Sequence, residues 1–256
     1  MDITFGSLFS GGGGLDLGLE RAGLKCAFQV ENDRHCLTLL ERHWPDVPKN
    51  EIRPCMGLVG GDPCPIRTHI GKAIGTTKPD LSGYFLAMVA RFKPRWVLRE
   101  NVPAPDVRDF AKVLDMLGYT TLVIFMDSAA FTGCRRLREF VVGFNRSESF
   151  ERFKDLVNIK TDERIGQANC QEKTSLRCIT CRSRGRYSTD FDYVYQERKG
   201  IRLYTHAERE LIQGLPVGWT DGIPNSARER GVGNAVTVPV AKWIGERIKE
   251  AIINHK

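Results

Sequence analysis

Short apolar runs and amphipathic segments alternate along the first 144 residues. The amphipathic segments place their apolar residues at helical spacing. The apolar runs that predict strands are residues 3–9, 27–30, 56–59, 96–98, 121–125 and 140–144, and the helical segments between them include residues 15–22, 84–92 and 110–117. Strands that alternate with helices predict an α/β fold with a doubly wound, mostly parallel sheet.

A glycine-rich turn, Ser10–Gly14, separates the first predicted strand from the first predicted helix. Glycines let a backbone approach a ligand closely, and the start of a helix offers free amides. About 20 positions later, Glu31-Asn32-Asp33 ends the second predicted strand. An acidic residue at that place can accept hydrogen bonds from ribose hydroxyls, so the pair of features indicates an adenosine-containing cofactor.

The third predicted strand ends at Gly60-Gly61, and Pro63-Cys64-Pro65 follows. The two prolines stiffen the backbone that presents the Cys64 thiol. Glu100 ends the next strand, and in a parallel sheet it lies at the same edge, where open α/β sheets bind ligands. Taken alone, Cys64 fits an ordinary loop cysteine and Glu100 a helix cap or surface acid. The polar residues that follow Cys64, as far as Pro79, are typical of a mobile lid beside a site.

Arg136 and Arg138 precede the strand at 140–144. Arginines that alternate at the start of a strand can face a phosphate or a carbonyl oxygen. They can equally form surface ion pairs of little energetic value.

Strand and helix patterns no longer alternate in residues 145–200. This stretch mixes Arg, Lys, Ser, Gly and aromatic residues. The net charge of the chain is +7, and residues 135–199 carry 15 Lys and Arg against 10 Asp and Glu. This indicates a small module for nucleic-acid contact. Cys170, Cys178 and Cys181 suggest zinc, but a fourth ligand at regular spacing is missing, so we expect no metal.

Helical patterns return after residue 200. Thr205, with Glu208 three residues later, predicts a capped helix whose inner side carries Leu211 and Ile212. A final amphipathic helix carries Val240, Ile244, Ile248 and Ile252. We therefore expect a catalytic domain of residues 1–144 and 226–256, interrupted by a small target-recognition domain of residues 145–225.

The composition is that of a soluble globular protein, with 41% hydrophobic and 27% charged residues in 256. No apolar run reaches the length of a membrane span, and the amino terminus lacks the pattern of a secretory signal. The eight scattered cysteines do not resemble a disulfide framework, so we expect a reducing cytoplasm.

Taken in order, these stretches resemble the cytosine-C5 DNA methyltransferase family over nearly the whole chain. The resemblance rests on residues 9–14 (cofactor loop), 31–33 (acidic motif), 61–64 (Pro-Cys loop), 100–102 (Glu-Asn-Val), 136–138 (arginine motif), 202–216 and 233–236. It implies a Rossmann-like AdoMet-methyltransferase fold and methyl transfer from S-adenosyl-L-methionine (AdoMet) to carbon 5 of a cytosine flipped out of double-stranded DNA. It also implies a monomeric enzyme of restriction-modification type.

The resemblance assigns a role to each candidate residue. The catalytic residues it implies are Cys64 as nucleophile, Glu100 at the ring N3, and Arg136 and Arg138 near O2. The cofactor-binding residues it implies are Phe9, Ser10, Gly11, Gly13, Leu15, Glu31, Asn32, Tyr84, Asn234 and Val236, where Asn234 can also serve only to hold a turn.

The chain departs from the family pattern at four places. Asp62 stands where an apolar residue is usual, Pro65 where Gln is usual, and Cys134 where the arginine motif begins with Gln. The family also has an acidic residue that contacts the adenine of AdoMet, and Glu51 is the nearest candidate for it in this chain. An RNA (tRNA) cytosine methyltransferase and a non-catalytic nucleic-acid-binding relative therefore stay open as alternatives. A dinucleotide oxidoreductase is disfavoured by the Pro-Cys and Glu-Asn-Val elements.

Overall fold

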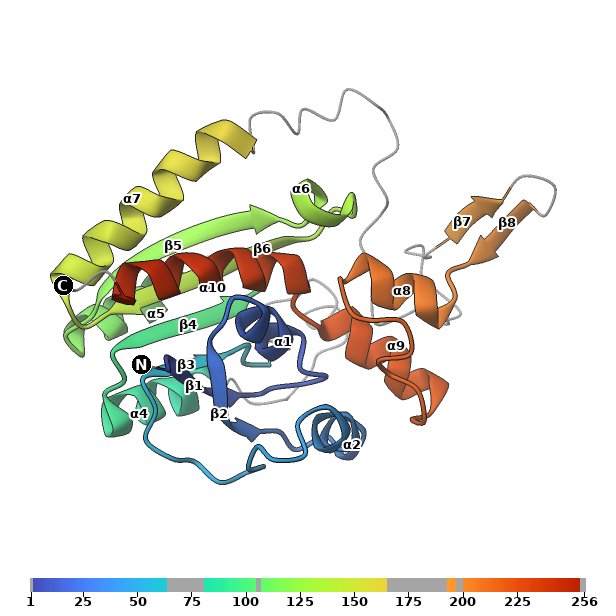
Figure 1. Ribbon diagram of the computed structural model, residues 1–256, viewed down its shortest axis with the longest axis horizontal. Coiled ribbons are helices and arrows are strands. Elements are labelled where there is room, and N and C mark those ends of the chain that lie inside the picture. The colour runs from blue at the N-terminus through green and yellow to red at the C-terminus, as the bar shows by residue number, and fades with distance from the viewer. Residues whose placement is uncertain (1, 64–80, 105–106, 165–192, 197–199, 254–256) are drawn as a thin grey trace.

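A six-stranded sheet forms the centre of the molecule (Figure 1). The computed structural model describes residues 2–63, 81–104, 107–164, 193–196 and 200–253. The strands are β1 (Thr4–Leu8), β2 (Lys25–Val30), β3 (Gly57–Gly60), β4 (Trp96–Asn101), β5 (Thr120–Asp127) and β6 (Leu137–Phe144). Their order is β2-β1-β3-β4-β6-β5, and β6 alone among them runs antiparallel to its neighbours. The prediction of a mostly parallel α/β sheet is confirmed.

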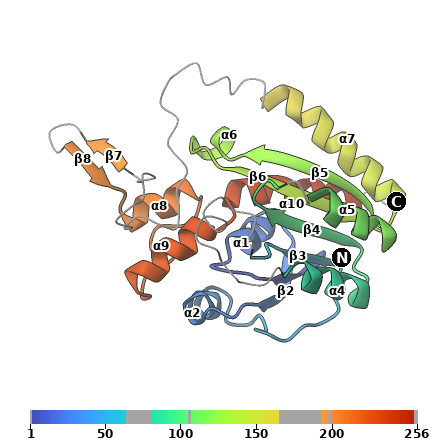
Figure 2. The same cartoon turned by 180° about the vertical axis from the view of Figure 1, so that it is seen from behind.

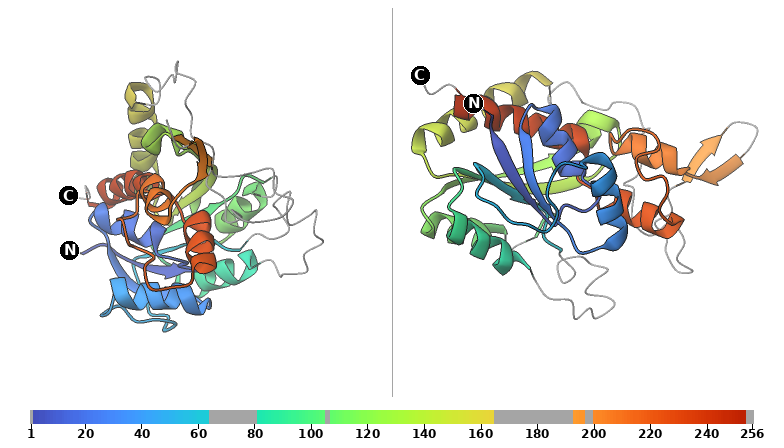
Figure 3. Two further views of the ribbon diagram at one scale, coloured as in Figure 1. Left: turned by 90° about the vertical axis from the view of Figure 1, so that its right-hand side faces the viewer. Right: turned by 60° about the horizontal axis from the view of Figure 1, so that its bottom comes forward.

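Helices cover both faces of this sheet, as expected for a doubly wound fold. On one face α1 (Gly14–Arg21), α7 (Ser147–Arg164) and α10 (Val238–Ile253) pack against a core that includes Trp96, Leu98 and Phe144. On the other face α4 (Ser82–Phe92) and α5 (Val107–Met116) pack on a core that includes Val97 and Val141. Figure 2 shows α4 and α5 from behind, and the left-hand view of Figure 3 shows α10 and α4 on opposite sides.

The central strand β4 is buried at all six positions. Side chains alternate between the two faces of a strand. Glu100 therefore lies on the face of Trp96 and Leu98, toward α1 and α10, whereas Arg99 lies on the face of Val97, toward α4 and α5.

Helix α7 corrects the expectation that regular structure is lost from residue 145. Its Phe150, Phe153 and Val157 are buried and belong to the same core as Phe144 of β6. Their spacing of three and four residues is helical, but charged residues between them hid the pattern. The predicted domain boundary at residue 145 falls just before this helix, and the division of the chain into two domains stays a prediction.

The chain after residue 200 forms α8 (His206–Ile212) and α9 (Asn225–Asn234). The predicted cap of α8 is confirmed, because Thr205 and Glu208 form a reciprocal capping box. The prediction that Leu211 lies on the inner side is wrong, since Leu211 is 57% exposed whereas Arg209 and Glu210 are buried.

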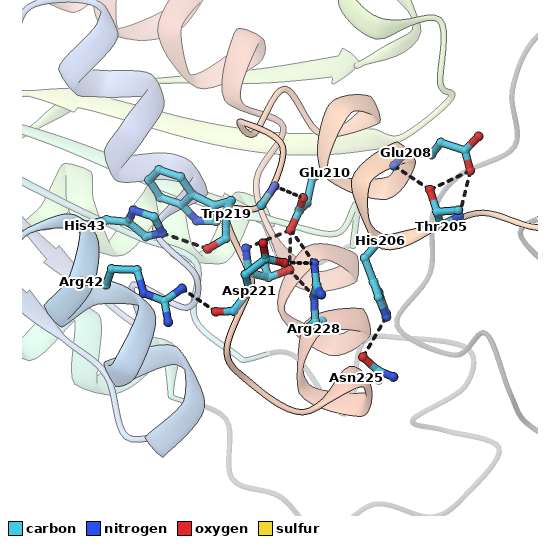
Figure 4. A network of polar contacts seen from close by, with 12 residues as sticks. Arg42, His43, Thr205, His206, Glu208, Glu210, Trp219, Asp221, Asn225 and Arg228 are labelled. Atoms are coloured by element: carbon cyan, nitrogen blue, oxygen red, sulfur yellow. Dashed lines mark hydrogen bonds and ion pairs between the residues drawn. The ribbon is translucent and has the colours of Figure 1, made fainter.

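The buried face of α8 is polar because Glu210 serves as an acceptor for the segment that follows. Its carboxylate accepts hydrogen bonds from the backbone amides of Gly218, at 2.7 Å, and Thr220, at 2.9 Å (Figure 4). Arg228 of α9 lies 3.4 Å from the same carboxylate. The buried Glu210 side chain thus fixes the backbone of the loop between α8 and α9.

Helices α2 and α6 and a hairpin complete the described chain. Helix α2 (Arg34–His43) is capped by Asp33, and α6 (Ala129–Thr132) is a single turn. Strands β7 (Tyr193–Gln196) and β8 (Gly200–Leu203) pair antiparallel and project away from the main sheet beyond α8 (Figure 1). Residues 165–192 and 197–199 of the expected recognition domain, with Cys170, Cys178 and Cys181, lie outside the described residues. Within them, no helix has both the length and the apolar character to cross a membrane.

The packing of α7 predicts a large cost for truncating its central side chain. We expect Phe153→Ala to lower the free energy of unfolding by about 3–5 kcal/mol, because it leaves a cavity beside Phe144. Asp155→Ala, on the exposed side of the same helix, should change it by less than about 0.5 kcal/mol. Urea unfolding measures both, and equal effects would show that α7 does not share the main core.

Candidate functional site

The glycine turn between β1 and α1 lies at the carboxyl edge of the sheet. Gly11 has a φ of 55°, a left-handed conformation that favours glycine. Its amide donates to Glu31 Oε2 at 2.7 Å. The turn is thereby joined to the end of the neighbouring strand β2.

Glu31 is held in a fixed orientation at this edge. Its second oxygen, Oε1, accepts from the amides of Asn32, at 2.7 Å, and Asp33, at 2.8 Å. The carboxylate is half-buried, so it still faces solvent on one side. An oriented acceptor beside a glycine turn suits the hydroxyls of a ribose. Glu51, the candidate acid for adenine, is exposed and forms an ion pair with Arg53.

The other residues expected at the cofactor differ in exposure. Phe9, with a φ of 55°, packs edge-to-face on Tyr84 of α4 with ring centroids 6.0 Å apart, and Tyr84 is 42% exposed. Asn32 and Asn234 are exposed. Ser10, Gly13, Leu15 and Val236 are buried, and Leu15 belongs to the core between α1 and α10. Phe9, Tyr84 and Glu31 are therefore at least partly accessible, whereas Leu15 is buried in the core.

A buried polar cluster under the turn escaped the sequence analysis. Asp16 of α1 is fully buried and accepts from Ser7 Oγ, at 2.6 Å, and Gln29 Nε2, at 2.7 Å. Ser10 of the turn donates to Ser7 Oγ at 2.9 Å. Burial raises the pKa of the Asp16 carboxyl to about 6, although both hydrogen bonds lower it. The only sequence signal for this cluster is an acid on the apolar side of the first helix.

A second expected group of residues meets where β4 ends and β6 begins. Because β6 is antiparallel to β4, the start of β6 lies at the carboxyl edge. Arg138 Nε lies 3.1 Å from Glu100 Oε1, and both side chains are largely buried. Arg136 is also buried and donates to the backbone oxygen of Ala235 at 3.1 Å. The structure thus joins the Glu-Asn-Val stretch, the arginine stretch and the Gly233–Val236 stretch in one place.

Burial raises the pKa of the Glu100 carboxyl above its ordinary value. Arg138 and Arg136 act against this, since their positive charges favour the ionised form. A carboxyl under these opposing influences can hold a proton and donate it in a hydrogen bond. Gly61 lies so close that a Cβ there would be 2.9 Å from Glu100 Oε2, so this position favours glycine.

Cys64 itself lies outside the described residues. The described chain reaches Pro63, three residues beyond β3, and β3 pairs in parallel with β4 so that Gly60 lies opposite Arg99. The strand that leads to Cys64 therefore ends beside the strand that carries Glu100. No group of three or more candidate metal ligands occurs within the described ranges.

Trp219 connects the segment after α8 with the glycine turn. Its indole Nε1 donates to the backbone oxygen of Gly12 at 2.8 Å. Its ring stacks on His43 of α2 at a centroid distance of 3.5 Å, and His43 also contacts the backbone oxygen of Trp219 (Figure 4). The sequence analysis did not single out Trp219, and an aromatic residue far along the chain gives no signal of this contact.

Comparison with known proteins agrees with this geometry. A family model described as C-5 cytosine-specific DNA methylase matches residues 3–180 and 159–250. The Type II methyltransferase M.BsuFI of Bacillus subtilis is 25% identical over 98% of this chain and 73% of its own length. The Type II methyltransferase M.HaeII of Haemophilus aegyptius is 26% identical over 93% of this chain and 90% of its own length.

Solved structures share the fold. A Spodoptera frugiperda DNMT2 mutant superposes with a TM-score of 0.71 at 14% identity, over 97% of this chain and all of its own. The Entamoeba histolytica methyltransferase EhMeth superposes with a TM-score of 0.70 at 14% identity, over 98% of both chains.

The buried Asp16 carboxyl predicts a pH-dependent stability. The folded chain keeps its proton to about pH 6, whereas the unfolded chain releases it near the ordinary value of 3.8. The free energy of unfolding therefore falls as the pH rises through this window. Asp16→Asn stays neutral, so its stability relative to the parent should increase by about 3 kcal/mol between about pH 4 and pH 7.

Urea unfolding without cofactor at several pH values tests this expectation. Asp155→Asn on the exposed side of α7 is the control and should show no such trend. A difference between Asp16→Asn and the parent that stays constant with pH would refute it.

Proposed function

The chain belongs to the C-5 cytosine-specific DNA methylase family, and from this premise we propose that Cys64 carries out the reaction through a covalent adduct with a cytosine flipped out of DNA. The family makes the chain an enzyme that methylates cytosine at carbon 5 with AdoMet as the methyl donor. The covalent route, the residue roles and the choice of DNA over RNA are what the proposal adds. The observation that best supports it is the buried contact between Glu100 and Arg138 at the edge where the strand leading to Cys64 ends.

The glycine turn and its surroundings fit AdoMet. Glu31, fixed by three backbone amides, would accept hydrogen bonds from the ribose hydroxyls. The edge-to-face pair of Phe9 and Tyr84 would border the bound AdoMet. The exposed Asn234 would also line the AdoMet pocket. When bound, AdoMet supplies a methyl group on a positively charged sulfur, which a carbon nucleophile can take.

Cytosine carbon 5 needs activation before it can act as that nucleophile. In the proposal the Cys64 thiolate forms a bond to carbon 6, and the electron pair of the 5,6 double bond becomes available at carbon 5. A protonated Glu100 donates to N3 and stabilises the ring as charge develops there. In the proposal Arg138, whose guanidinium contacts the Glu100 carboxyl, faces the O2 side of the base.

The second half of the reaction restores the aromatic ring. After carbon 5 has gained the methyl group, it loses its proton to a base, and the electron pair of that C–H bond re-forms the 5,6 double bond. The bond between Cys64 and carbon 6 breaks in the same step, so the thiolate leaves unchanged. The adduct is thus an intermediate and not a product.

Double-stranded DNA is the substrate that the relatives favour. The matching family model is named for cytosine-specific DNA methylation, and the relatives M.BsuFI and M.HaeII are Type II methyltransferases. A base in a duplex must leave the stack to reach a thiol, so the proposal includes base flipping. The basic residues within 145–200 would supply most phosphate contacts and select the sequence. The proposal includes a monomer that acts in the cytoplasm.

Replacement of the nucleophile should separate binding from chemistry. We expect Cys64→Ser to lower transfer of labelled methyl from AdoMet to DNA by more than about 10³-fold, because a serine hydroxyl is not ionised at neutral pH. DNA affinity, measured by fluorescence anisotropy, should change by less than about threefold. Transfer at the parental rate would contradict the covalent route.

A duplex that contains 5-fluorocytosine should trap the intermediate. Fluorine on carbon 5 cannot leave as a proton, so the bond to Cys64 cannot be released after methyl transfer. We expect a denaturation-resistant complex with the parent enzyme and AdoMet, and none with Cys64→Ser. An active enzyme that yields no complex would refute the adduct.

The choice of nucleic acid is tested by exposing mixed DNA and RNA to the enzyme with AdoMet, followed by bisulfite sequencing of both. We expect methylated cytosines in DNA within a short sequence context and background levels in RNA. Methylation confined to RNA would overturn the assignment of substrate.

A further inference from the structure

A second charged cluster lies across β4 from Glu100. Arg99 is 1% exposed, and it forms a two-pronged ion pair with Asp62. The distances are 2.5 Å from Nε to Oδ1 and 2.9 Å from Nη2 to Oδ2. Pairs of this kind fix orientation as well as distance.

The cluster extends beyond these two residues. Arg99 Nη1 lies 3.8 Å from Oε1 of the buried Glu139 of β6, and the guanidinium lies over the Phe110 ring, 4.2 Å from its centroid. Asn101 Nδ2 donates to the backbone oxygen of Asp62 at 3.2 Å. Asp62 is thus held by its side chain and by its backbone.

The cluster connects the three segments that carry the proposed catalytic residues. Asp62 precedes Cys64 by two residues, Arg99 precedes Glu100, and Glu139 follows Arg138. Alternation along β4 and β6 places Glu100 and Arg138 on one face of the sheet. It places Arg99 and Glu139 on the other face. Glu139 Oε2 also accepts from the amide of Ala104, at 3.0 Å, in the segment that follows Glu100.

Stability alone is a poor reason for such a cluster. Removing two charges from water costs several kcal/mol per ion, and well-packed apolar residues are often at least as stable in their place. A two-pronged ion pair fixes the orientation of its two side chains, and an apolar pair does not. Two residues of chain span at most about 7 Å, so the place of Asp62 limits where the backbone of Cys64 can lie.

We infer that Asp62 and Arg99 are positioning residues for the methyl transfer: their ion pair sets the place of the Cys64 thiol relative to the pyrimidine held by Glu100. This inference rests on the proposed role of Cys64. It gives a function to the acid at position 62, where the family resemblance leads one to expect an apolar residue.

Asp62 and Arg99 shift the pKa of the Glu100 carboxyl in opposite directions. Asp62 raises the pKa of the Glu100 carboxyl and Arg99 lowers it, in addition to the lowering by Arg138 and Arg136. These two shifts oppose each other, and the role that we infer for the intact pair is geometric.

The test compares Asp62→Asn with the double variant Asp62→Leu/Arg99→Met. Asp62→Asn keeps the size of the side chain but removes the carboxylate that forms the two-pronged ion pair with Arg99. We expect the rate of adduct formation with the 5-fluorocytosine duplex to fall by about 10–100-fold, because an error of about 1 Å at a reacting atom has effects of this size. The KM for AdoMet should change by less than about twofold.

The double variant distinguishes positioning from stability. It removes both charges of the Asp62–Arg99 pair, and Glu139 keeps the hydrogen bond from the Ala104 amide, so its free energy of unfolding should recover part of the way toward the parental value. The adduct rate should stay low, because the apolar pair lacks the two-pronged contact. Phe153→Ala, destabilised at a distant site, is the control and should form the adduct at the parental rate under conditions where it is folded.

Each result supports or overturns the inference. Asp62→Asn with a parental adduct rate, or a double variant that regains the rate together with stability, would overturn it. If the parent transfers methyl groups without forming any adduct, the route through Cys64 fails. The inference then fails with it, whereas a parental adduct rate in Asp62→Asn overturns the inference and leaves the route through Cys64 standing.

Discussion

The pairing of β4 with the antiparallel strand β6 is the constraint on which the site depends. Five strands end at the carboxyl edge, and β6 begins there. Arg138, near the start of β6, therefore meets Glu100 at the end of β4, although about 40 residues separate them in the chain. A parallel β6 would have carried Arg138 to the opposite end of the sheet. The direction of one strand thus decides that Glu100 has a cationic partner.

Local patterns were sufficient for the elements that make this edge. Continuous apolar runs predicted β1 to β6, and the glycine turn, the capping box at Thr205 and the apolar stripe of α10 each came from short-range signals. Helix α7 was missed because three buried residues are dispersed among many charged ones. Leu211 was misplaced because an apolar residue was assumed to face inward, whereas Glu210 occupies that side to bind backbone amides.

The candidate site was only partly predictable for a different reason. Glu31, Glu100 and Arg138 follow from motifs that lie at strand ends, but their partners are set by tertiary contacts. Nothing local indicates that Asp16 lies under the glycine turn or that the Trp219 indole bonds to Gly12. Such contacts join residues as much as 207 positions apart. They appear only when the sheet order and the packing of helices are known.

The ion pair between Asp62 and Arg99 also restricts how this sequence can evolve. A substitution at either position alone removes one member of the buried ion pair and leaves the other charge in the interior. Each single substitution therefore lowers the free energy of unfolding. The pair can be replaced in evolution only when both residues change nearly together, or when a stabilising substitution elsewhere comes first. Descendants of this chain should therefore inherit the two residues as a unit, and sequence drift here should be slower than burial alone would dictate.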